Sequence, residues 1–191
     1  PDDRPMMPRL LAVGVHGVMP PLVHTPAQAK NMVDCLKYAP LGRRGANGGR
    51  GPRWGAYENY TVVSNEATLT IAQCESVESV NNIEAIAATP GIDCIFIGTG
   101  DLSLDMGLQF KADSSASHKV DSDEMVAAID RVLKACQKNN VIPGIVTATA
   151  EDAARRIKQG FQLVTCMNDL GFFCSRTKQH IQSVRELAAR P

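Results

Sequence analysis

Short apolar runs alternate with stretches of helical periodicity along most of the chain. The apolar runs are continuous rather than alternating, which is typical of parallel strands that are covered by helices. Strands are predicted at residues 17–23, 67–75, 93–98, 141–147 and 161–167. Helical patterns follow at residues 25–39, 76–89, 123–140, 150–160 and 175–190. The pattern therefore predicts five strand–helix units in succession, within a single α/β domain that spans residues 1–191.

Local signals refine the boundaries of these elements. Thr25 is a helix N-cap and is followed by a proline at the first helical position. Pro20 and Pro21 reduce the regularity expected of the first strand, because proline cannot donate a backbone hydrogen bond. We expect a long loop rich in Gly and Arg at residues 40–60, and a polar, exposed excursion at residues 111–122.

Two architectures fit a succession of parallel strand–helix units. One is an open, doubly wound sheet, and the other is a (β/α)₈ barrel. A barrel typically has eight strands and about 250 residues. Only five strands are predicted here, so the chain is either an open sheet or a barrel without its first three units. The pattern alone leaves both open.

Composition narrows the range of partners. Twenty basic and twenty acidic residues give a formal net charge of zero, which argues against nucleic acid or an anionic membrane as partner. No run approaches the ~18 apolar residues of a membrane-spanning helix. The six cysteines form no Cys-x-x-Cys pair, and several lie in apolar strands, so we expect reduced thiols and a cytoplasmic protein. The basic cluster at residues 42–53 fits a solvated loop and an anion-contacting loop equally well.

Acidic side chains follow two of the predicted strands. Gln73 and Glu75 lie two positions apart at the end of the strand over residues 67–75, so they face the same side. Asp101 comes just after the strand over residues 93–98. If the two strands are neighbours, Glu75 and Asp101 converge at the carboxyl edge of the sheet. Paired carboxylates beside an amide suit Mg²⁺ or Mn²⁺, which prefer oxygen ligands.

A glycine-rich turn separates the second of these strands from its acid. Gly98, Thr99 and Gly100 can present successive backbone N–H groups to an anion and let a ligand approach closely. A cation beside such a turn would form a pocket for a small carboxylate that is chelated through a neighbouring oxygen. The alternative is structural: Asp101 can be the N-cap of the next helix, and Glu75 a first-turn acid.

At these residues the sequence resembles a known family. "QCES" followed by "GIDCIFIGTGDLS" is similar to the paired signatures of the HpcH/HpaI aldolase family, the metal-dependent pyruvate aldolases related to citrate lyase β subunits. "LLAVGVHGVMPPLVHTPAQAKNMV", "KYAPLGRRGANGG" and "RWGAYENY" resemble other family segments in the same order. The resemblance implies a (β/α)₈ barrel of the phosphoenolpyruvate/pyruvate type, with about the last five βα units in this chain. It also implies assembly into homotrimers or homohexamers.

The resemblance also assigns roles to residues. Glu75 and Asp101 would be the ligands of Mg²⁺, Mn²⁺ or Co²⁺, and Gln73 would reach the keto oxygen of a bound 2-oxo acid. The segment from Gly98 to Asp101, with the N–H groups near Gly100 and Asp101, would hold its carboxylate. The implied reaction is reversible retro-aldol cleavage of a 4-hydroxy-2-oxo acid to pyruvate and an aldehyde through a metal-stabilised enolate. Oxaloacetate decarboxylation, chemistry like that of macrophomate synthase, or an inactive incomplete copy are the alternatives.

The chain also departs from the family pattern. Residues 98–101 read Gly-Thr-Gly-Asp, where the family more often has Gly-Pro-Ala-Asp. The family's general-base histidine and substrate-binding arginine belong to strands that would precede this chain. None of its four histidines matches that base, and His24, the one nearest the carboxyl edge, is interpreted as a solvated loop residue. We therefore expect residues 1–191 alone to show little or no turnover.

Overall fold

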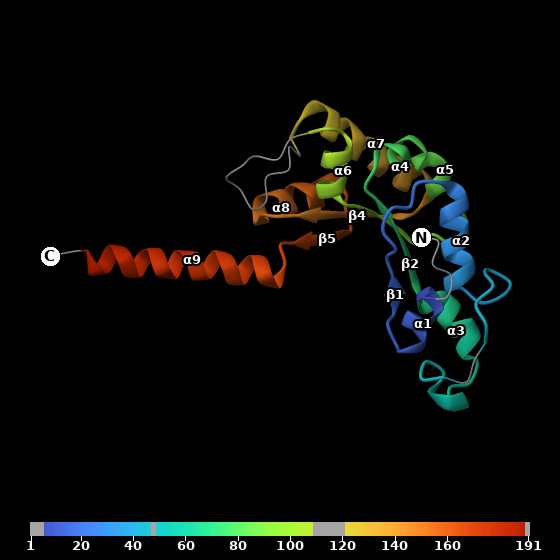
Figure 1. Cartoon of the computed structure of the whole chain (residues 1–191). Coiled ribbons are helices and arrows are strands. Elements are labelled where there is room, and N and C mark those ends of the chain that lie inside the picture. Colours follow the sequence, from blue (N-terminus) through green and yellow to red (C-terminus); the bar gives the residue numbers. More distant parts are fainter. Residues whose placement is uncertain (1–5, 47–48, 109–120, 190–191) are drawn as a thin grey trace.

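A computed structural model describes residues 6–46, 49–108 and 121–189 (Figure 1). Within them, five strands form one parallel sheet in the order β1-β2-β3-β4-β5. The strands are β1 (Gly17–Val18), β2 (Leu69–Cys74), β3 (Cys94–Ile97), β4 (Ile142–Thr147) and β5 (Leu163–Cys166). Every strand pairs with the next one along the chain, with no reversal of order. A doubly wound sheet needs such a reversal. The observed order is therefore that of part of a barrel, and the open-sheet alternative is wrong.

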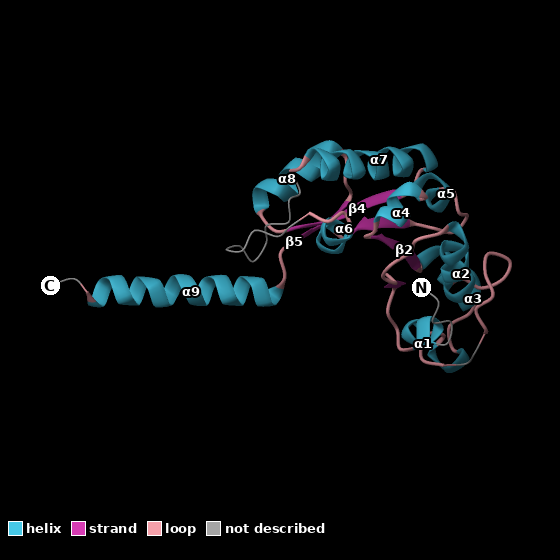
Figure 2. Cartoon of the chain, turned by 45° about the horizontal axis from the view of Figure 1, so that its top comes forward, coloured by secondary structure: helices cyan, strands magenta, loops and turns pink. Residues whose placement is uncertain are grey.

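Helices alternate with the strands along the chain, and most of them, α9 excepted, pack around the sheet (Figure 2). The helices are α1 (Met6–Ala12), α2 (Pro26–Leu36), α3 (Tyr60–Ala67), α4 (Val77–Asn81), α5 (Ile83–Ala87), α6 (Thr99–Asp105), α7 (Asp123–Asn139), α8 (Ala150–Gln159) and α9 (Asp169–Ala188). A short 3₁₀ turn, η1 (Arg53–Gly55), interrupts the loop before α3. Parallel pairing brings the carboxyl ends of neighbouring strands together, with Gln73 opposite Phe96 and Cys74 opposite Ile97.

The core lies between the sheet and these helices. All four residues of β3 are buried, as a central strand covered on both faces requires. Helix α7 turns one apolar face towards β3, β4 and α5, and among its buried residues Met125, Ile129 and Val132 are almost fully enclosed. Each such side chain contributes about 1.5–3 kcal/mol through burial.

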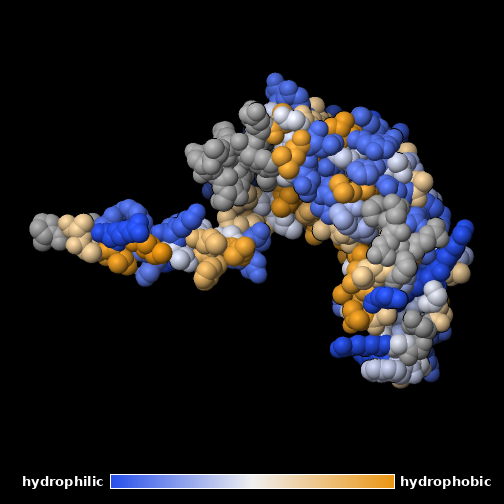
Figure 3. Space-filling model, viewed as in Figure 1, coloured by the Kyte–Doolittle hydropathy of each residue, from blue (hydrophilic) through white to orange (hydrophobic). Residues whose placement is uncertain are grey.

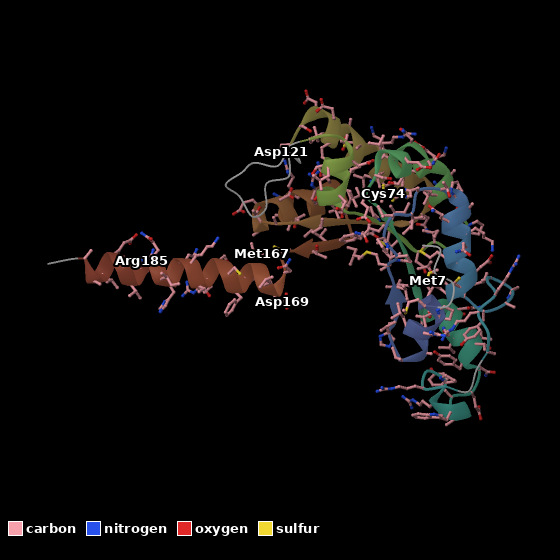
Figure 4. The ribbon with its side chains drawn as sticks, viewed as in Figure 1. Met7, Cys74, Asp121, Met167, Asp169 and Arg185 are labelled. Carbon is pink, nitrogen blue, oxygen red and sulfur yellow. The ribbon has the colours of Figure 1, made fainter. Side chains whose placement is uncertain are left out.

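Four of the six cysteines belong to this interior, and all six are free thiols. Cys74 lies inside the body of the molecule (Figure 4), and burial raises its pKa to about 11. The same desolvation raises the pKa of Cys94 and of Cys136. These thiols stay protonated at neutral pH and pack as small apolar side chains, as expected for Cys74 and Cys94. Cys166 was expected to pack in the same way, but it is exposed at the end of β5.

The observed elements differ from the expected ones mainly around glycine, proline and asparagine. The first strand pairs only over Gly17 and Val18, because the prolines at positions 20 and 21 end its regular ladder. The helix expected at residues 76–89 is two short helices, α4 and α5, which meet at Asn82. Helix α6 was expected to be a glycine-rich turn.

Three helical segments begin outside the predicted patterns. Helices α1 and α3 were not predicted, and α9 begins at Asp169 rather than near residue 175. The N-cap of α9 is Asn168, whose side chain accepts a hydrogen bond from the Gly171 N–H group. The polar excursion expected at residues 111–122 lies almost wholly outside the described residues.

Helix α9 projects away from the rest of the chain (Figure 1). Met167 and Asp169 mark its departure from β5, and Arg185 lies near its far end (Figure 4). None of its residues is buried, and large apolar side chains are exposed along it (Figure 3). Even so, no helix within the described ranges combines the length and the apolar character needed to cross a membrane.

Candidate functional site

Glu75 is the buried acid at the carboxyl end of β2. Its side chain is enclosed, with 3% of the residue surface exposed. One carboxylate oxygen, Oε1, accepts a hydrogen bond from the Leu22 N–H group at 2.9 Å. The other, Oε2, accepts one from the Gln73 side-chain amide at 2.7 Å. Leu22 has a left-handed backbone with φ of 56°, in the irregular segment that follows β1. Glu75 and Gln73 therefore face the same side, as their spacing predicted.

Gly98 provides the space that this pair occupies. A Cβ atom at position 98 would lie 2.6 Å from Glu75 Oε2 and 3.1 Å from Gln73 Nε2. The backbone φ of Gly98 is −86°, which any residue can adopt, so the requirement is for space and not for conformational freedom. The stretch was expected to form a flexible turn. Instead, Gly98 is the N-cap of α6, and Thr99 and Gly100 form its first turn.

Asp101 lies in the first turn of α6, exposed beside Glu75. The pKa of Glu75 is raised, first because the carboxyl group is buried, and also because the Asp101 carboxyl group repels its charge and hydrogen-bonds to its protonated form. The Leu22 N–H group and His24 oppose this rise. The structure thus brings Glu75, Gln73 and Asp101 together at one edge of the sheet. Their roles as metal ligands and as a keto-group donor stay predictions.

A pocket of about 560 Å³ opens directly over the two acids. The residues that line it are Pro21, Leu22, His24, Glu75, Ser76, Asp101, Leu104 and Asp105. Gln73 and Gly98 are not among these residues, but Gln73 is only half-buried and donates a hydrogen bond to Glu75 at the edge of the pocket. Acidic side chains form the floor of the pocket, and apolar side chains form its walls. The pocket also contains the polar residues His24 and Asp105.

The donor set fits a hard divalent cation. Among the described residues, neither Glu75 nor Asp101 forms an ion pair with Lys or Arg, so their charge is left without a basic partner. In the described ranges, no group of three or more His, Cys, Asp or Glu side chains is placed to hold a metal ion together. Mg²⁺ commonly uses one or two protein carboxylates and completes its shell with water and substrate oxygens. A two-carboxylate site is therefore sufficient for this ion.

His24 was expected to be solvated, but the structure shows a half-buried residue held by several hydrogen bonds. Its ring Nδ1 lies 2.7 Å from Ser76 Oγ. Its backbone N–H donates to the Gln28 side chain at 2.8 Å, and its carbonyl accepts from the Asn82 side chain at 2.9 Å. One sequence feature could have indicated that His24 is held in place. It directly precedes Thr25, which forms the capping box of α2 with Gln28.

A partial parallel barrel with acidic residues at its carboxyl edge has the arrangement of a (β/α)₈-barrel active site. Residues 2–175 match the family described as HpcH/HpaI aldolase/citrate lyase. The chain therefore belongs to this family, and the resemblance found in the sequence is confirmed.

Individual relatives support both the family and the fold. A hydroxypyruvate/pyruvate aldolase of Chromohalobacter salexigens is 36% identical over 170 residues, covering 88% of this chain and 64% of that protein. A crystal structure of a family protein from Burkholderia cenocepacia J2315 matches with a TM-score of 0.85 at 29% identity, covering 96% of this chain and 70% of that one. Macrophomate synthase matches with a TM-score of 0.81 at 25% identity, covering 98% and 64%. These neighbours confirm the predicted partial barrel, and this chain spans about two thirds of their lengths.

Proposed function

We propose that this chain carries the metal-binding and oxo-acid-binding part of a carbon–carbon lyase. The reaction is the reversible retro-aldol cleavage of a 4-hydroxy-2-oxo acid to pyruvate and an aldehyde. The observation that carries the proposal is the buried Glu75 carboxylate, set against Asp101 without a basic partner in the described residues. A buried carboxylate beside a second carboxylate is stabilised by a shared proton or by a cation. The aldolase name of the Chromohalobacter salexigens relative supports the reaction class.

Each side chain around Glu75 and Asp101 has a role in the proposed reaction. Glu75 and Asp101 would hold Mg²⁺ or Mn²⁺, with Co²⁺ as a third candidate. When bound, such a cation supplies Lewis-acid polarisation of a 2-keto group. Gln73 gives one amide hydrogen to Glu75 and has a second for the keto oxygen. The substrate carboxylate would lie against Gly98 and the N–H groups of the first turn of α6, at Thr99, Gly100 and Asp101.

The proton-transfer part of the reaction has no candidate base of the family type. None of the four histidines in the sequence matches the family's general base. A positioned acid–base group typically contributes about 10²- to 10⁴-fold to the rate. We therefore expect slow turnover by residues 1–191, with pyruvate as the product that defines the reaction.

A second chemistry would use the same side chains. Oxaloacetate decarboxylation, or a reaction like that of macrophomate synthase, also requires a chelated 2-oxo acid. The structural match to macrophomate synthase favours keeping this alternative. An inactive aldolase-like chain is the third possibility, and it differs from the first two in releasing no pyruvate from any 2-oxo acid.

Calorimetry and product analysis test the proposal. We expect Mg²⁺ or Mn²⁺ to bind the chain and to increase its affinity for pyruvate, and Glu75→Ala to abolish both effects. Unchanged metal affinity in Glu75→Ala would refute the ligand assignment. Pyruvate release measured with a 4-hydroxy-2-oxo acid and with oxaloacetate then separates the aldolase from the decarboxylase.

The exposed surface of α9 supports a proposal about assembly. We infer that the chain forms a homo-oligomer, as the family resemblance implies, with a second copy covering the apolar side chains of this helix. The buried free thiols support a cytoplasmic location, because the reducing cytoplasm keeps cysteines unpaired.

A further inference from the structure

The pocket over Glu75 and Asp101 contains two further polar groups, His24 and Asp105, that the proposed chemistry does not use. We propose that His24, with Asp105, recognises a hydroxyl group on the part of the substrate beyond the 2-oxo acid. His24 would thus be a specificity-determining residue for the aldehyde-derived half. The inference rests on the proposed function, because it requires the 2-oxo acid end to be anchored at Glu75 and Asp101.

The Ser76 hydroxyl can donate either to Ser79 Oγ or to His24 Nδ1, and the shorter distance to Nδ1 favours one of the two neutral tautomers of His24. Ser76 Oγ accepts the Ser79 N–H group at 3.0 Å, and the Ser79 hydroxyl donates to the Ser76 carbonyl at 2.7 Å. The hydroxyl proton of Ser76 is thus left to donate, and Nδ1 of His24 at 2.7 Å is a closer acceptor than Ser79 Oγ at 3.2 Å. A neutral imidazole that accepts at Nδ1 carries its proton at Nε2. In this tautomer, His24 has an Nε2–H donor that takes no part in the hydrogen bond to Ser76.

The anchoring also holds the ring in place. The backbone of His24 is bound on both sides, by Gln28 and by Asn82, and its ring is bound by Ser76. These partners come from α2, from α4 and from the junction between α4 and α5. A residue whose backbone and ring are both hydrogen-bonded loses little further conformational freedom when it binds a ligand. Among the described residues, Nε2 has no hydrogen-bond partner, so its donor is available to the pocket.

Asp105 supplies an acceptor to the same pocket. One of its oxygens, Oδ2, accepts the Val77 N–H group at 2.7 Å, which fixes the carboxylate at the end of α6. No group in the described part of the chain donates to its other oxygen, which can accept a hydrogen bond from a ligand. A donor at His24 and an acceptor at Asp105 match a hydroxyl group, which both accepts and donates.

The negative charge of the pocket argues against recognition of a carboxylate group at this position. Three carboxylates line it, from Glu75, Asp101 and Asp105. A divalent cation would balance the first two, but Asp105 would still repel a second carboxylate on the substrate. A neutral hydroxyl therefore fits better than an anionic group.

The test compares three 2-oxo acids of equal chain length by calorimetry on the whole chain with saturating Mg²⁺. They are 4-hydroxy-2-oxopentanoate, 2-oxopentanoate and 2-oxoglutarate. Pyruvate release in the same samples corrects the concentration of the first ligand for cleavage. We expect the hydroxyl-bearing acid to bind about threefold to tenfold more tightly than 2-oxopentanoate, the range of one net hydrogen bond, and 2-oxoglutarate to bind least tightly.

Variants then assign the preference to His24. His24→Ala should remove the preference for the hydroxyl group while leaving the affinities for Mg²⁺ and 2-oxopentanoate within about twofold of the parent chain. His24→Gln should restore part of it, because the glutamine amide can donate from nearly the same place as Nε2. His180→Ala, which changes an exposed histidine on α9, is the matched control and should have no effect.

The outcomes separate this inference from the proposed function. If His24→Ala weakens all three ligands equally, or if the parent chain shows no preference for the hydroxyl group, the role of His24 is refuted while the oxo-acid site stands. If the parent chain binds no 2-oxo acid in the presence of Mg²⁺, the proposed function fails, and this inference fails with it.

Discussion

Glu75 is enclosed by the fold, and each of its carboxylate oxygens accepts one hydrogen bond, from Leu22 and Gln73. The raised pKa means that the native state binds this proton more tightly than the unfolded chain, whose carboxyl keeps the ordinary value of 4.5. The stability of the metal-free chain should therefore fall as pH rises from the ordinary pKa through the raised native one. Once ionised, this carboxylate lowers the stability of the metal-free chain, while the proposed metal site requires its charge.

Replacing Glu75 with glutamine should expose this conflict between stability and function. Glu75→Gln removes the charge but keeps an acceptor for the Leu22 N–H group, and the Gln73 amide can rotate to present its oxygen. Without metal, we expect the variant to be more stable than the parent chain at neutral pH, and to lack the fall in stability with rising pH. Its affinity for Mg²⁺ should fall by at least about tenfold. Urea unfolding at a series of pH values, with calorimetry, measures both; a stability difference that is the same at every pH would contradict the account.

Gly98 gives a second prediction, one that depends on space. An alanine methyl group at this position would meet Glu75 Oε2 and Gln73 Nε2, so Gly98→Ala should displace both side chains without straining the backbone. We expect Mg²⁺ affinity to fall by about tenfold or more, while the far-ultraviolet circular dichroism stays unchanged. Gly45→Ala is the matched control, because nothing lies within 4 Å of the Cβ position there. Equal metal affinity in both variants would show that Gly98 does not shape the site.

Sequence reasoning reached these residues by different routes. The shared orientation of Gln73 and Glu75 follows from strand geometry, so it was predictable. Gly98 was singled out for the flexibility of its backbone, but the structure gives space as the reason, which depends on two side chains on another strand. The anchoring of His24 could not be found from sequence, because its ring partner Ser76 lies 52 residues away.

Some strands and helices could be predicted from the sequence, and others could not. Continuous apolar runs predicted all five strands. Every residue of β3 is buried, whereas β5 has no buried residue. Helix α7 was predicted nearly to the residue, since one face of it packs on the sheet and the opposite one is polar. A helix after this turn was considered only with Asp101 as its N-cap, because glycines at positions 98 and 100 are poor helix formers. The structure begins α6 earlier, with Gly98 as the N-cap.

Helix α9 carries a prediction about self-association. Phe172 and Phe173 are 57% and 70% exposed, which is unusual for aromatic side chains unless a partner covers them. If a second copy covers them, replacing both with serine should raise the dissociation constant of the oligomer by at least about tenfold. Arg176→Ser on the same helix is the control, because it removes a charge and no apolar side chain. Sedimentation velocity measures the change; a parent chain that stays monomeric at micromolar concentration would contradict the prediction.

The curved sheet brings together groups that are far apart in the sequence. Leu22 from the segment after β1, Glu75 from the end of β2 and Asp101 from α6 line the same pocket. Each element carries part of the site, and only their order in the sheet makes the parts adjacent. The same order places His24 and Asp105 around the pocket over these acids.

Anomalous diffraction from crystals soaked in Mn²⁺ tests the central claim most directly, because it locates the ion without relying on activity. We expect one anomalous peak bonded to carboxylate oxygens of both Glu75 and Asp101, and we expect it to disappear in Glu75→Gln. A manganese ion bound elsewhere, or no ion between these two side chains at saturating Mn²⁺, would contradict the account.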